Sequence, residues 1–533
     1  MPSPAATSSD EDAARHGAKP VFTSERTREA TAAPKLANQA PRFTQYFPLG
    51  YKEAFNQWWA TVSPAIAEHN VLSFVPHLRQ PPTHTQTGTH ATSSDEAPMS
   101  YNPDPSRAAT PVRTTSMNDP YGPRSWRSMM VQLSGKNRAL NEFSVEREGE
   151  VVEENLVMLH GYGAGLGFFY KNFEGISRVK GLKLYALDML GMGRSTRPPF
   201  KVNAKEQEGK ISEAENWFID ALEEWRVLRK IEKFTLLGHS MGGYMAVAYA
   251  LKYPGHVNKL ILASPVGIPA DPYATKAEIP EQSTIENEVY QDQEEDIVNK
   301  PNANGSNGAR NAKAQGAAES TADDPPRRRI PRWASYLWDA NVSPFSIVRW
   351  AGPLGPRFVS GWTSRRFSHL PETEAQALHE YAYSLFRQRG SGEYALAYIL
   401  APGAFARSPL IDRIQNVGRQ PLGLSGAPST AVGAAKRETG YPVIMMYGEN
   451  DWMDVAGGLA AEQKLKEAKA AALATATPRE KQEERGSARV VIIQKAGHHL
   501  YLDGHEEFNE VIRREMEETK RDLRKQREQN VES

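Results

Sequence analysis

The stretch FTLLGHSMGG, residues 234–243, decides which fold this chain adopts. The apolar run 234–237 leads into the pattern Gly-x-Ser-x-Gly, from Gly238 to Gly242, and a helical pattern follows it. A serine between a buried strand and a helix stands on a sharp, strained turn that projects its hydroxyl above the edge of a sheet. The flanking glycines let the strand and the helix approach each other without side-chain clashes. The stretch therefore predicts that Ser240 is a nucleophile.

Short apolar runs continue on both sides of this turn, and helical patterns separate them. The predicted strands are 155–159, 182–188, 234–237, 260–263, 443–447 and 490–493, and helical patterns cover 211–229 and 241–253. Continuous apolar strands that alternate with helices are typical of a mostly parallel sheet with helices on both faces. The long interval between residues 263 and 443 predicts an inserted helical lid at the carboxyl edge of the sheet, where open α/β sheets hold their ligands. We expect an α/β protein with a core and a lid.

Polar composition sets the expected boundaries of the parts. The segments 1–40, about 80–122, about 275–328 and about 416–438 hold too few apolar residues to offset the entropy lost on ordering. The expected parts are a disordered N-terminal segment (1–45), an amphipathic helix with a polar linker (46–128), a first part of the core (129–268), a lid with a disordered insertion at about 275–328 (269–440), a second part of the core (441–518) and a charged tail (519–533). The Ala-, Lys- and Glu-rich stretch 461–487 is predicted to be a charged surface helix.

Residues 50–67 read as one helix with an apolar stripe. The stripe consists of Tyr51, Phe55, Trp58, Trp59, Val62 and Ile66. The polar face of this helix is not notably basic, so the pattern favours a helix packed on the core over an anchor in a membrane interface.

Composition and charge exclude several classes of function. The 533 residues contain 64 Lys and Arg, 64 Asp and Glu, and no Cys. The absence of a basic excess argues against a protein whose main partner is nucleic acid. The absence of cysteine excludes thiolate nucleophiles, disulfides, iron–sulfur clusters and cysteine zinc sites. No apolar stretch reaches the roughly 20 residues that cross a bilayer. The N-terminus is rich in Ala, Ser and Thr with scattered Arg, as in mitochondrial transit peptides, although Asp10, Glu11 and Asp12 depart from that pattern.

A nucleophilic serine needs a base, and the base needs an acid that orients it. In this architecture the acid and the histidine follow the serine in the sequence. Asp451 follows the strand 443–447, and His498 follows the strand 490–493, so both are expected at the carboxyl edge beside Ser240. Asp454 is an alternative acid and His499 an alternative base. Position directly after the strand favours Asp451 and His498.

The developing oxyanion should be held by two backbone amides. One is expected from Met241, directly after the nucleophile, and the other from Tyr162 in the His-Gly-Tyr-Gly loop after the first parallel strand. We expect structural roles for His160 and His239 in these two motifs, and for Asp188, which precedes Ser240 in the chain. The predicted chemistry requires no metal and no organic cofactor.

Five motifs together resemble one family. HGYGAG (160–165), LDMLGMGRS (187–195), GHSMGG (238–243), YGEND (447–451) and AGHHLYLD (496–503) are similar to the motifs of the α/β-hydrolase fold family. Within it they resemble the subgroup of the comparative gene identification-58 lipid-droplet coactivator, the N-acylphospholipid hydrolases and the fungal mitochondrial cardiolipin deacylases. The lid stretches NVSPFSIVRWAGPLGPRFVS and SGEYALAYILAPGAFARSPL share this resemblance.

The resemblance implies a lipid acyl hydrolase. The coactivator lacks the serine of the motif, whereas this chain keeps Ser240. The fungal branch implies cardiolipin as substrate and a mitochondrial location, peripheral to the membrane. The other branches leave a cytoplasmic or lipid-droplet location open. The same subgroup shows a His-x4-Asp pattern, here His498 and Asp503, which has been read as an acyltransferase signature. On a helix these two residues would not share a face, so we assign Asp503 to the start of the following helix.

Three functions therefore stay open. The first is a serine acyl hydrolase that acts on a glycerophospholipid at a membrane surface. The second is an acyltransferase that moves an acyl group from acyl-CoA to lysophosphatidic acid, and the third is a non-catalytic lipid-binding coactivator. The lid mixes cations with aromatic residues, which suits docking on anionic phospholipid or a core within the lid itself. These residues are Arg327, Arg328, Arg329, Arg332, Trp333, Trp338, Phe345, Arg349, Trp350, Arg357, Phe358, Trp362, Arg365 and Arg366.

Overall fold

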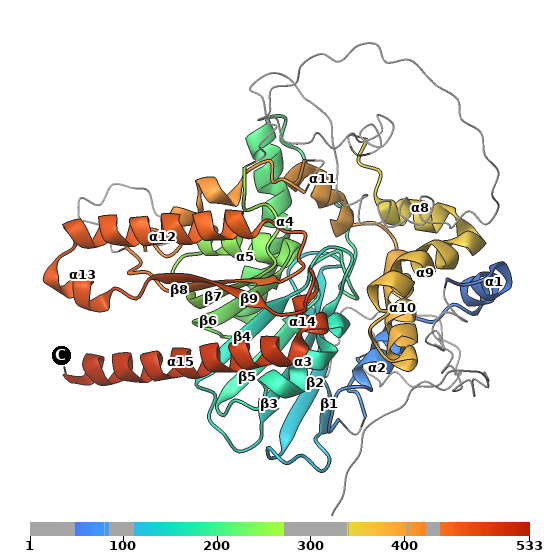
Figure 1. Cartoon of the computed structure of the whole chain (residues 1–533), viewed down its shortest axis with the longest axis horizontal. Helices are drawn as coiled ribbons and strands as arrows, with labels where there is room; N and C mark the ends of the chain where they lie inside the picture. Colours follow the sequence, from blue (N-terminus) through green and yellow to red (C-terminus); the bar gives the residue numbers. More distant parts are fainter. Residues whose placement is uncertain are drawn as a thin grey trace, which may run out of the picture. The chain divides into compact units, whose positions relative to one another are not determined.

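A computed structural model describes residues 48–78, 80–84, 111–270, 338, 340–401, 404–422 and 437–532. Its centre is a nine-stranded sheet in the order β1-β2-β3-β5-β4-β6-β7-β8-β9 (Figure 1). The strands are β1 Val112–Thr115, β2 Arg124–Gln132, β3 Ala139–Arg147, β4 Glu154–Leu159, β5 Leu182–Leu187, β6 Phe234–His239, β7 Val257–Ala263, β8 Pro442–Gly448 and β9 Ser487–Ile493. The strands from β4 to β9 run parallel, and β1, β2 and β3 pair antiparallel at one edge. The predicted mostly parallel sheet is confirmed.

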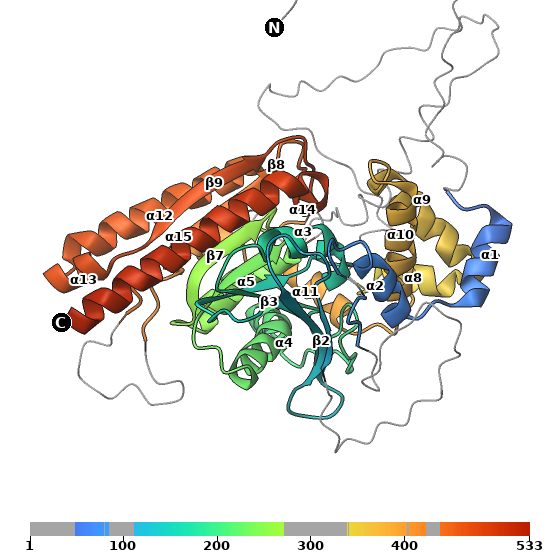
Figure 2. The same ribbon diagram turned by 90° about the horizontal axis from the view of Figure 1, so that it is seen from below.

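Helices cover both faces of the sheet (Figures 1 and 2). On one face α4 (Gln207–Leu228), α5 (Met241–Lys252) and α12 (Val455–Thr475) pack on side chains such as Leu236 and Leu260. On the other face α3 (Tyr170–Ile176) and α15 (His505–Glu532) pack on Leu237 and Ile261. Every residue of β6 and β7 is buried, because a central parallel strand is covered on both sides.

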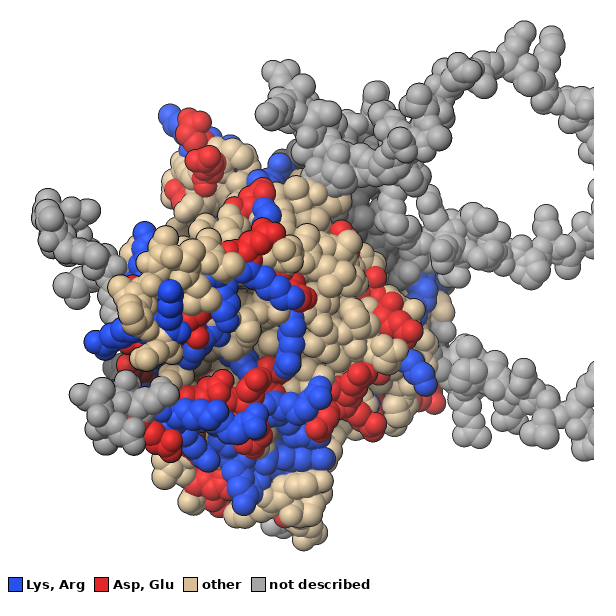
Figure 3. Space-filling view, turned by 60° about the vertical axis from the view of Figure 1, so that its left-hand side comes forward, with Lys and Arg blue, Asp and Glu red and all other residues tan. Residues whose placement is uncertain are grey.

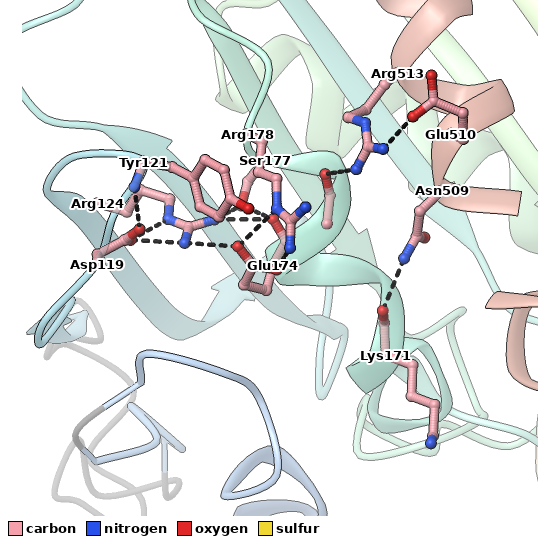
Figure 4. Close-up of polar contacts among 11 residues, drawn as sticks. Asp119, Tyr121, Arg124, Lys171, Glu174, Ser177, Arg178, Asn509, Glu510 and Arg513 are labelled. Carbon is pink, nitrogen blue, oxygen red and sulfur yellow. Dashed lines mark hydrogen bonds and ion pairs between the residues drawn. The ribbon is translucent and has the colours of Figure 1, made fainter. Parts of the chain in front are cut away.

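The sheet begins earlier than residue 129, where the sequence places the start of the core. β1 and most of β2 lie in the stretch expected to be a polar linker. The sequence did not predict a strand there because β2, RSWRSMMVQ, mixes polar with apolar residues. Its alternating burial is that of an antiparallel strand near a sheet edge. The guanidinium of Arg124 is fully buried there and pairs with Asp119 at 2.6 Å and with Glu174 of α3 at 3.0 Å (Figure 4).

The C-terminal residues also differ from the prediction of a charged tail from 519 onward. α15 continues to Glu532, and Thr519 and Lys520 are buried on it. Asn509 and Arg513 tie the helix to α3 by donating to the carbonyls of Lys171, at 3.0 Å, and Gly175, at 3.2 Å (Figure 4). Charge conceals this packing in the sequence, because the exposed face of the helix is dense in Lys, Arg and Glu.

Opposite charges alternate on the surface around this end of the molecule. Figure 3 shows Lys and Arg side chains interleaved with Asp and Glu side chains. One such pair is Arg524 with Glu153 at 2.6 Å. The predicted charged helix within 461–487 is confirmed as the greater part of α12 followed by α13 (Pro478–Glu483).

The lid is inserted between β7 and β8, as the interval between the strands predicts. Its elements are α8 Pro344–Trp350, η3 Gly352–Leu354, α9 Gly355–Arg366, α10 Glu372–Phe386, η4 Gly392–Ala395, α11 Leu396–Ile399, η5 Leu410–Asp412 and η6 Ile414–Asn416. The predicted disordered segments 1–40 and 275–328, and most of the other two, lie outside the described residues, as do Arg327, Arg328, Arg329, Arg332 and Trp333.

The predicted single helix over 50–67 is two helices. α1 (Tyr51–Ala60) ends at Thr61, which has a positive φ of 44°, and α2 (Pro64–Leu72) begins behind a Ser63 cap. Pro64 suits the first turn of a helix but cannot stand inside one, because it lacks an N–H and clashes with the preceding turn. α2 packs on α10 of the lid.

The predicted packing of the stripe on the core is wrong for Tyr51, Phe55 and Trp59, whereas Val62 does pack against the core. Tyr51 is 71% exposed and Trp59 is 74% exposed, and Phe55 is exposed beside them. α1 instead contacts α9 and η3 of the lid. None of the helices in the described parts of the chain is long and apolar enough to cross a bilayer.

Candidate active site

Ser240 stands on the turn between β6 and α5. Its backbone angles, φ 51° and ψ −117°, are strained for a residue with a side chain. The Ser240 amide donates to the carbonyl of Ala263 in β7 at 2.9 Å, which fixes the turn to the neighbouring strand. The turn is so tight that a β-carbon at Gly238 would lie 2.2 Å from the carbonyl oxygen of Gly242. The Gly-x-Ser-x-Gly pattern is therefore a steric requirement of this turn.

Asp451 and His498 meet at the same edge of the sheet. Asp451 follows β8, His498 follows β9, and the two strands are neighbours, so their carboxyl ends open side by side. The Nδ1 atom of His498 lies 3.2 Å from Oδ1 of Asp451. Both His498 and Ser240 line one pocket. The structure thus brings together the serine, the histidine and the acid that the sequence predicts.

The carboxylate of Asp451 is held ionised by its hydrogen bonds. Burial acts to raise its pKa, but the hydrogen bonds from His498, Ser264 and the Met453 amide outweigh burial, and the pKa lies below its ordinary value. The Met453 amide donates to Oδ1 at 3.0 Å, and the Ser264 hydroxyl donates to Oδ2. An ionised acid in this position fixes the Nδ1–H tautomer of His498 and leaves Nε2 as the proton acceptor.

The alternative acid and the alternative base have other partners. The Asp454 carboxylate caps α12 by accepting from the Ala456 amide at 2.9 Å. His499 accepts at Nδ1 from the guanidinium of Arg366 and does not contact Asp451. These contacts favour Asp451 over Asp454 as the orienting acid, and His498 over His499 as the base.

Two of the polar residues predicted to be structural, Asp188 and His160, are buried and hydrogen-bonded within the protein. Asp188 accepts from the amides of Leu166 and Arg194, each at 2.7 Å. His160 receives the Met189 amide at Nε2 at 3.1 Å, and burial lowers its pKa. These bonds are consistent with structural roles.

His239 supports the loop that carries His498. Its Nε2 donates to the carbonyl of His498 at 3.0 Å, and the two ring centres are 4.8 Å apart. Burial, and next the charge of His498, hold the pKa of His239 well below its usual range, so the ring is neutral. Its proton is therefore on Nε2, where the bond to the carbonyl uses it.

Sequence reasoning missed Ser264. This serine follows β7, has a positive φ of 45°, and donates its amide to the carbonyl of Met446 in β8 at 2.7 Å. Its hydroxyl reaches Asp451 from there. The available signal was the Ser264-Pro265 pair directly after a buried strand, because polar residues at carboxyl strand ends face the ligand edge.

The two predicted oxyanion residues flank Ser240. The amide of Met241 occupies the first position of α5, where no intrahelical acceptor precedes it. Tyr162 lies in the loop after β4, and its ring stacks on Phe345 of the lid at 5.0 Å. Both residues line the pocket with Ser240.

The pocket over Ser240 has a cavity volume of about 130 Å³ and is partly open to solvent. Its walls come from the oxyanion loop, α5, α8, α9, α10 and the loop after β8, so lid and core enclose it together. Most of its lining is apolar, and among the described residues that line it none is Lys, Arg, Asp or Glu. The apolar lining includes Phe168, Val266, Phe345, Val348, Val359, Trp362, Phe386, Leu396, Leu400 and Trp452. Such a cavity suits an alkyl chain.

Asp503 does not pair with His498. Its Oδ2 accepts from the Gly497 amide at 3.0 Å, and its carboxylate lies 3.6 Å from Arg366 and 3.3 Å from His369. It is the last residue of α14 (Leu500–Asp503) rather than the first of the next helix. The role predicted for it at a helix start is therefore replaced by a bond to the loop that carries His498.

Comparison with known proteins agrees with this fold. A model of the alpha/beta hydrolase fold matches residues 154–505. A 1-acylglycerol-3-phosphate O-acyltransferase of Arabidopsis thaliana is 32% identical over 62% of this chain, which spans only 63% of that protein. The rat protein named 1-acylglycerol-3-phosphate O-acyltransferase ABHD5 is 29% identical over 67% of this chain and 76% of its own length. The bovine (lyso)-N-acylphosphatidylethanolamine lipase is 28% identical over 67% of this chain and 77% of its own length.

These relatives confirm the resemblance to the subgroup that contains the coactivator and the N-acylphospholipid hydrolases. Among solved structures, the naproxen esterase of Bacillus subtilis is similar over 74% of this chain and 93% of its own, with 14% identity and a TM-score of 0.40. The carboxylesterase CesB of the same organism is similar over 73% of this chain and 90% of its own, with 12% identity and a TM-score of 0.37.

Proposed function

The chain belongs to the α/β-hydrolase fold family, and we propose that it is a serine acyl hydrolase that removes an acyl chain from a glycerophospholipid. The observation that carries the proposal is the 3.2 Å contact between His498 and Asp451 in a pocket shared with Ser240. The apolar lining of that pocket supports a long acyl chain as the group transferred to the serine. The names of the relatives support a lipid substrate.

The proposed reaction has two steps and uses no metal or organic cofactor. In the first, Nε2 of His498 takes the proton of the Ser240 hydroxyl while its oxygen attacks the ester carbonyl. The amides of Met241 and Tyr162 hold the oxyanion, His498 returns the proton to the departing glycerol oxygen, and the lyso-lipid leaves. In the second, His498 takes a proton from water, which attacks the acyl-serine, and the fatty acid leaves as Ser240 regains its proton.

We propose that the enzyme works at a phospholipid surface and docks through an aromatic rim beside the pocket. We use "aromatic rim" for Tyr51, Phe55, Trp59, Trp350 and Phe358, which are exposed on α1, α8 and α9. Trp350 is 73% exposed, and a cluster of exposed apolar side chains marks an interaction surface. Phe358 belongs to both the rim and the pocket lining, so the rim is continuous with the path to Ser240. Aromatic side chains favour the membrane–water interface.

Vesicle sedimentation tests this docking. Trp59→Ser combined with Trp350→Ser should weaken binding to phosphatidylcholine–phosphatidylglycerol vesicles by roughly 10-fold or more, because two exposed indoles lose their contact with lipid. The matched control is Val227→Ser, which removes an apolar side chain, 57% exposed, from α4. Equal binding by the wild type, the double variant and the control would refute docking through the rim.

Cardiolipin is the substrate that we propose to test first, with a mitochondrial location peripheral to the membrane. Both rest on the resemblance of the motifs to the fungal cardiolipin deacylases. The decisive experiment incubates the wild type and Ser240→Ala with cardiolipin or phosphatidylglycerol vesicles and measures the lipids by mass spectrometry. Loss of one acyl chain that depends on Ser240, without acyl-CoA, supports the hydrolase.

The second candidate is an acyl-CoA-dependent lysophosphatidic acid acyltransferase, which the names of the Arabidopsis and rat relatives favour. It would use the same serine, with a lipid hydroxyl in place of water. Turnover only when both acyl-CoA and lysophosphatidic acid are present would move the proposal to acyl transfer. A non-catalytic coactivator remains the third alternative, and identical lipid profiles for the wild type and Ser240→Ala under every condition would favour it.

A further inference from the structure

His499 lies on the wall of the pocket without taking part in the proposed reaction. Its side chain is 8% exposed, it lines the pocket together with Ser240, and its ring centre is 5.5 Å from that of His498. The two rings are perpendicular, at 89°. A second histidine at this distance from the base is therefore close to any ester bound for attack by Ser240.

Arg366 of the lid fixes the protonation state of His499. Its guanidinium donates to Nδ1 of the ring. Burial, and next the charge of Arg366, hold the pKa of His499 well below its usual range, so the ring is neutral. A neutral imidazole that accepts at Nδ1 carries its proton on Nε2. Among the described residues, no partner is found for this Nε2–H.

The positive charge behind the ring is incompletely balanced. Among the described residues, the carboxylate nearest to Arg366 is that of Asp503, at 3.6 Å, which also accepts from the Gly497 amide and contacts His369. The Nε atom of Arg366 is buried and has no partner among the described residues. This charge polarises the Nε2–H of His499 as a donor, and a donor of that kind binds anionic oxygen more strongly than neutral oxygen.

We infer that His499, backed by Arg366, is the part of the site that recognises the phosphate of the phospholipid substrate. The inference rests on the proposed function and deepens it. In a glycerophospholipid only a few covalent bonds separate the ester from the phosphate, which matches two adjacent histidines, one acting at each group. The rest of the pocket lining is largely apolar, so His499 supplies the donor that distinguishes a phospholipid from a neutral glyceride. An anionic phosphate oxygen is a stronger acceptor for this donor than water, so the bound phosphate is favoured.

The test compares two lipids that differ only in the phosphate. Dioleoyl phosphatidic acid and dioleoylglycerol are presented in mixed micelles, and the ratio of their kcat/KM values is measured for each variant. The wild type should prefer phosphatidic acid. In His499→Ala the ratio should fall by about 10- to 100-fold, as expected for the loss of a hydrogen bond to a charged group. His499→Gln keeps an N–H donor and should recover part of the preference.

Arg366→Gln removes the positive charge behind His499 and keeps the imidazole, so it is sufficient by itself if His499→Ala does not fold. The ratio of the two kcat/KM values should also fall in Arg366→Gln, mainly because KM for phosphatidic acid rises. The matched control is His369→Ala, which removes an imidazole that contacts Asp503 outside the pocket lining.

Two results overturn the inference: a wild type without preference for phosphatidic acid, or a ratio that His499→Ala and Arg366→Gln leave unchanged. Either result counts only if the wild type hydrolyses these lipids and Ser240→Ala does not. Turnover of these lipids that persists in Ser240→Ala would instead contradict the proposed function.

Discussion

Replacing Ser240 with glycine should stabilise the protein while removing the proposed nucleophile. The backbone of Ser240, at φ 51° and ψ −117°, lies in a region that glycine adopts readily and other residues do not. A residue held in such a conformation costs of order 1–3 kcal/mol. The matched reference is Ser240→Ala, which also lacks the hydroxyl but keeps the β-carbon and the strain.

The size of the effect follows from three opposing contributions. Relief of strain is worth about 2 kcal/mol at the middle of the range above. The greater conformational freedom of glycine in the unfolded chain lowers the free energy of unfolding by about 0.7 kcal/mol. Loss of a half-buried methyl group lowers it by about 0.5 kcal/mol. Ser240→Gly should therefore be more stable than Ser240→Ala by about 1 kcal/mol, which corresponds to a rise in Tm of roughly 2 °C.

Thermal unfolding followed by circular dichroism measures this difference, with urea unfolding as a second measure. Both variants should lack ester hydrolysis. If Ser240→Gly is no more stable than Ser240→Ala, the strain argument is refuted, and the turn is then relaxed in the native protein. Equal stability of all three proteins would mean that the neighbouring strands impose no cost on this conformation.

The remaining predictions concern the acid, its support and a buried carboxyl. Asp451→Asn should lower kcat by about 10⁴-fold, because the amide favours the wrong tautomer of the histidine. Asp454→Ala should instead lower the free energy of unfolding by only about 1 kcal/mol, because α12 loses its cap. A larger decrease in kcat for Asp454→Ala than for Asp451→Asn would reverse the assignment of the acid. Ser264→Ala should lower kcat by roughly 10-fold, because the Asp451 carboxylate loses one hydrogen bond, and an unchanged kcat would show that the other donors suffice. Burial raises the pKa of Glu154 to about 7, so the unfolded chain releases this proton first as the pH rises, and stability should fall by about 2–3 kcal/mol between pH 4.5 and 7. Urea unfolding should show a flatter pH dependence for Glu154→Gln and an unchanged one for the exposed control Glu148→Gln, and equal slopes would contradict the shift.

Some parts of the fold could not be predicted because different environments produce the same pattern. The stripe from Tyr51 to Ile66 has helical periodicity whether it faces a core or a lipid surface, and Pro64 decided that it is two helices. The buried Arg124 made β2 read as linker, because a buried ion pair with Glu174, distant in sequence, is invisible in a polar run. α15 read as a charged tail beyond residue 519 because its exposed face carries most of the charge.

The sequence by itself determined the family and the positions of the three predicted catalytic residues. A strand, a Gly-x-Ser-x-Gly turn and a helix permit one local geometry at Ser240, and parallel strands bring the residues that follow them to one edge, where Asp451 and His498 meet. Only the tertiary structure decided which side chains support them. Ser264 reaches Asp451 across 187 positions of the chain, and Arg366 reaches His499 across 133. Contacts of this kind depend on how the lid and the strands pack. A local pattern can place Ser264 at the ligand edge, but it does not specify which side chain the serine contacts.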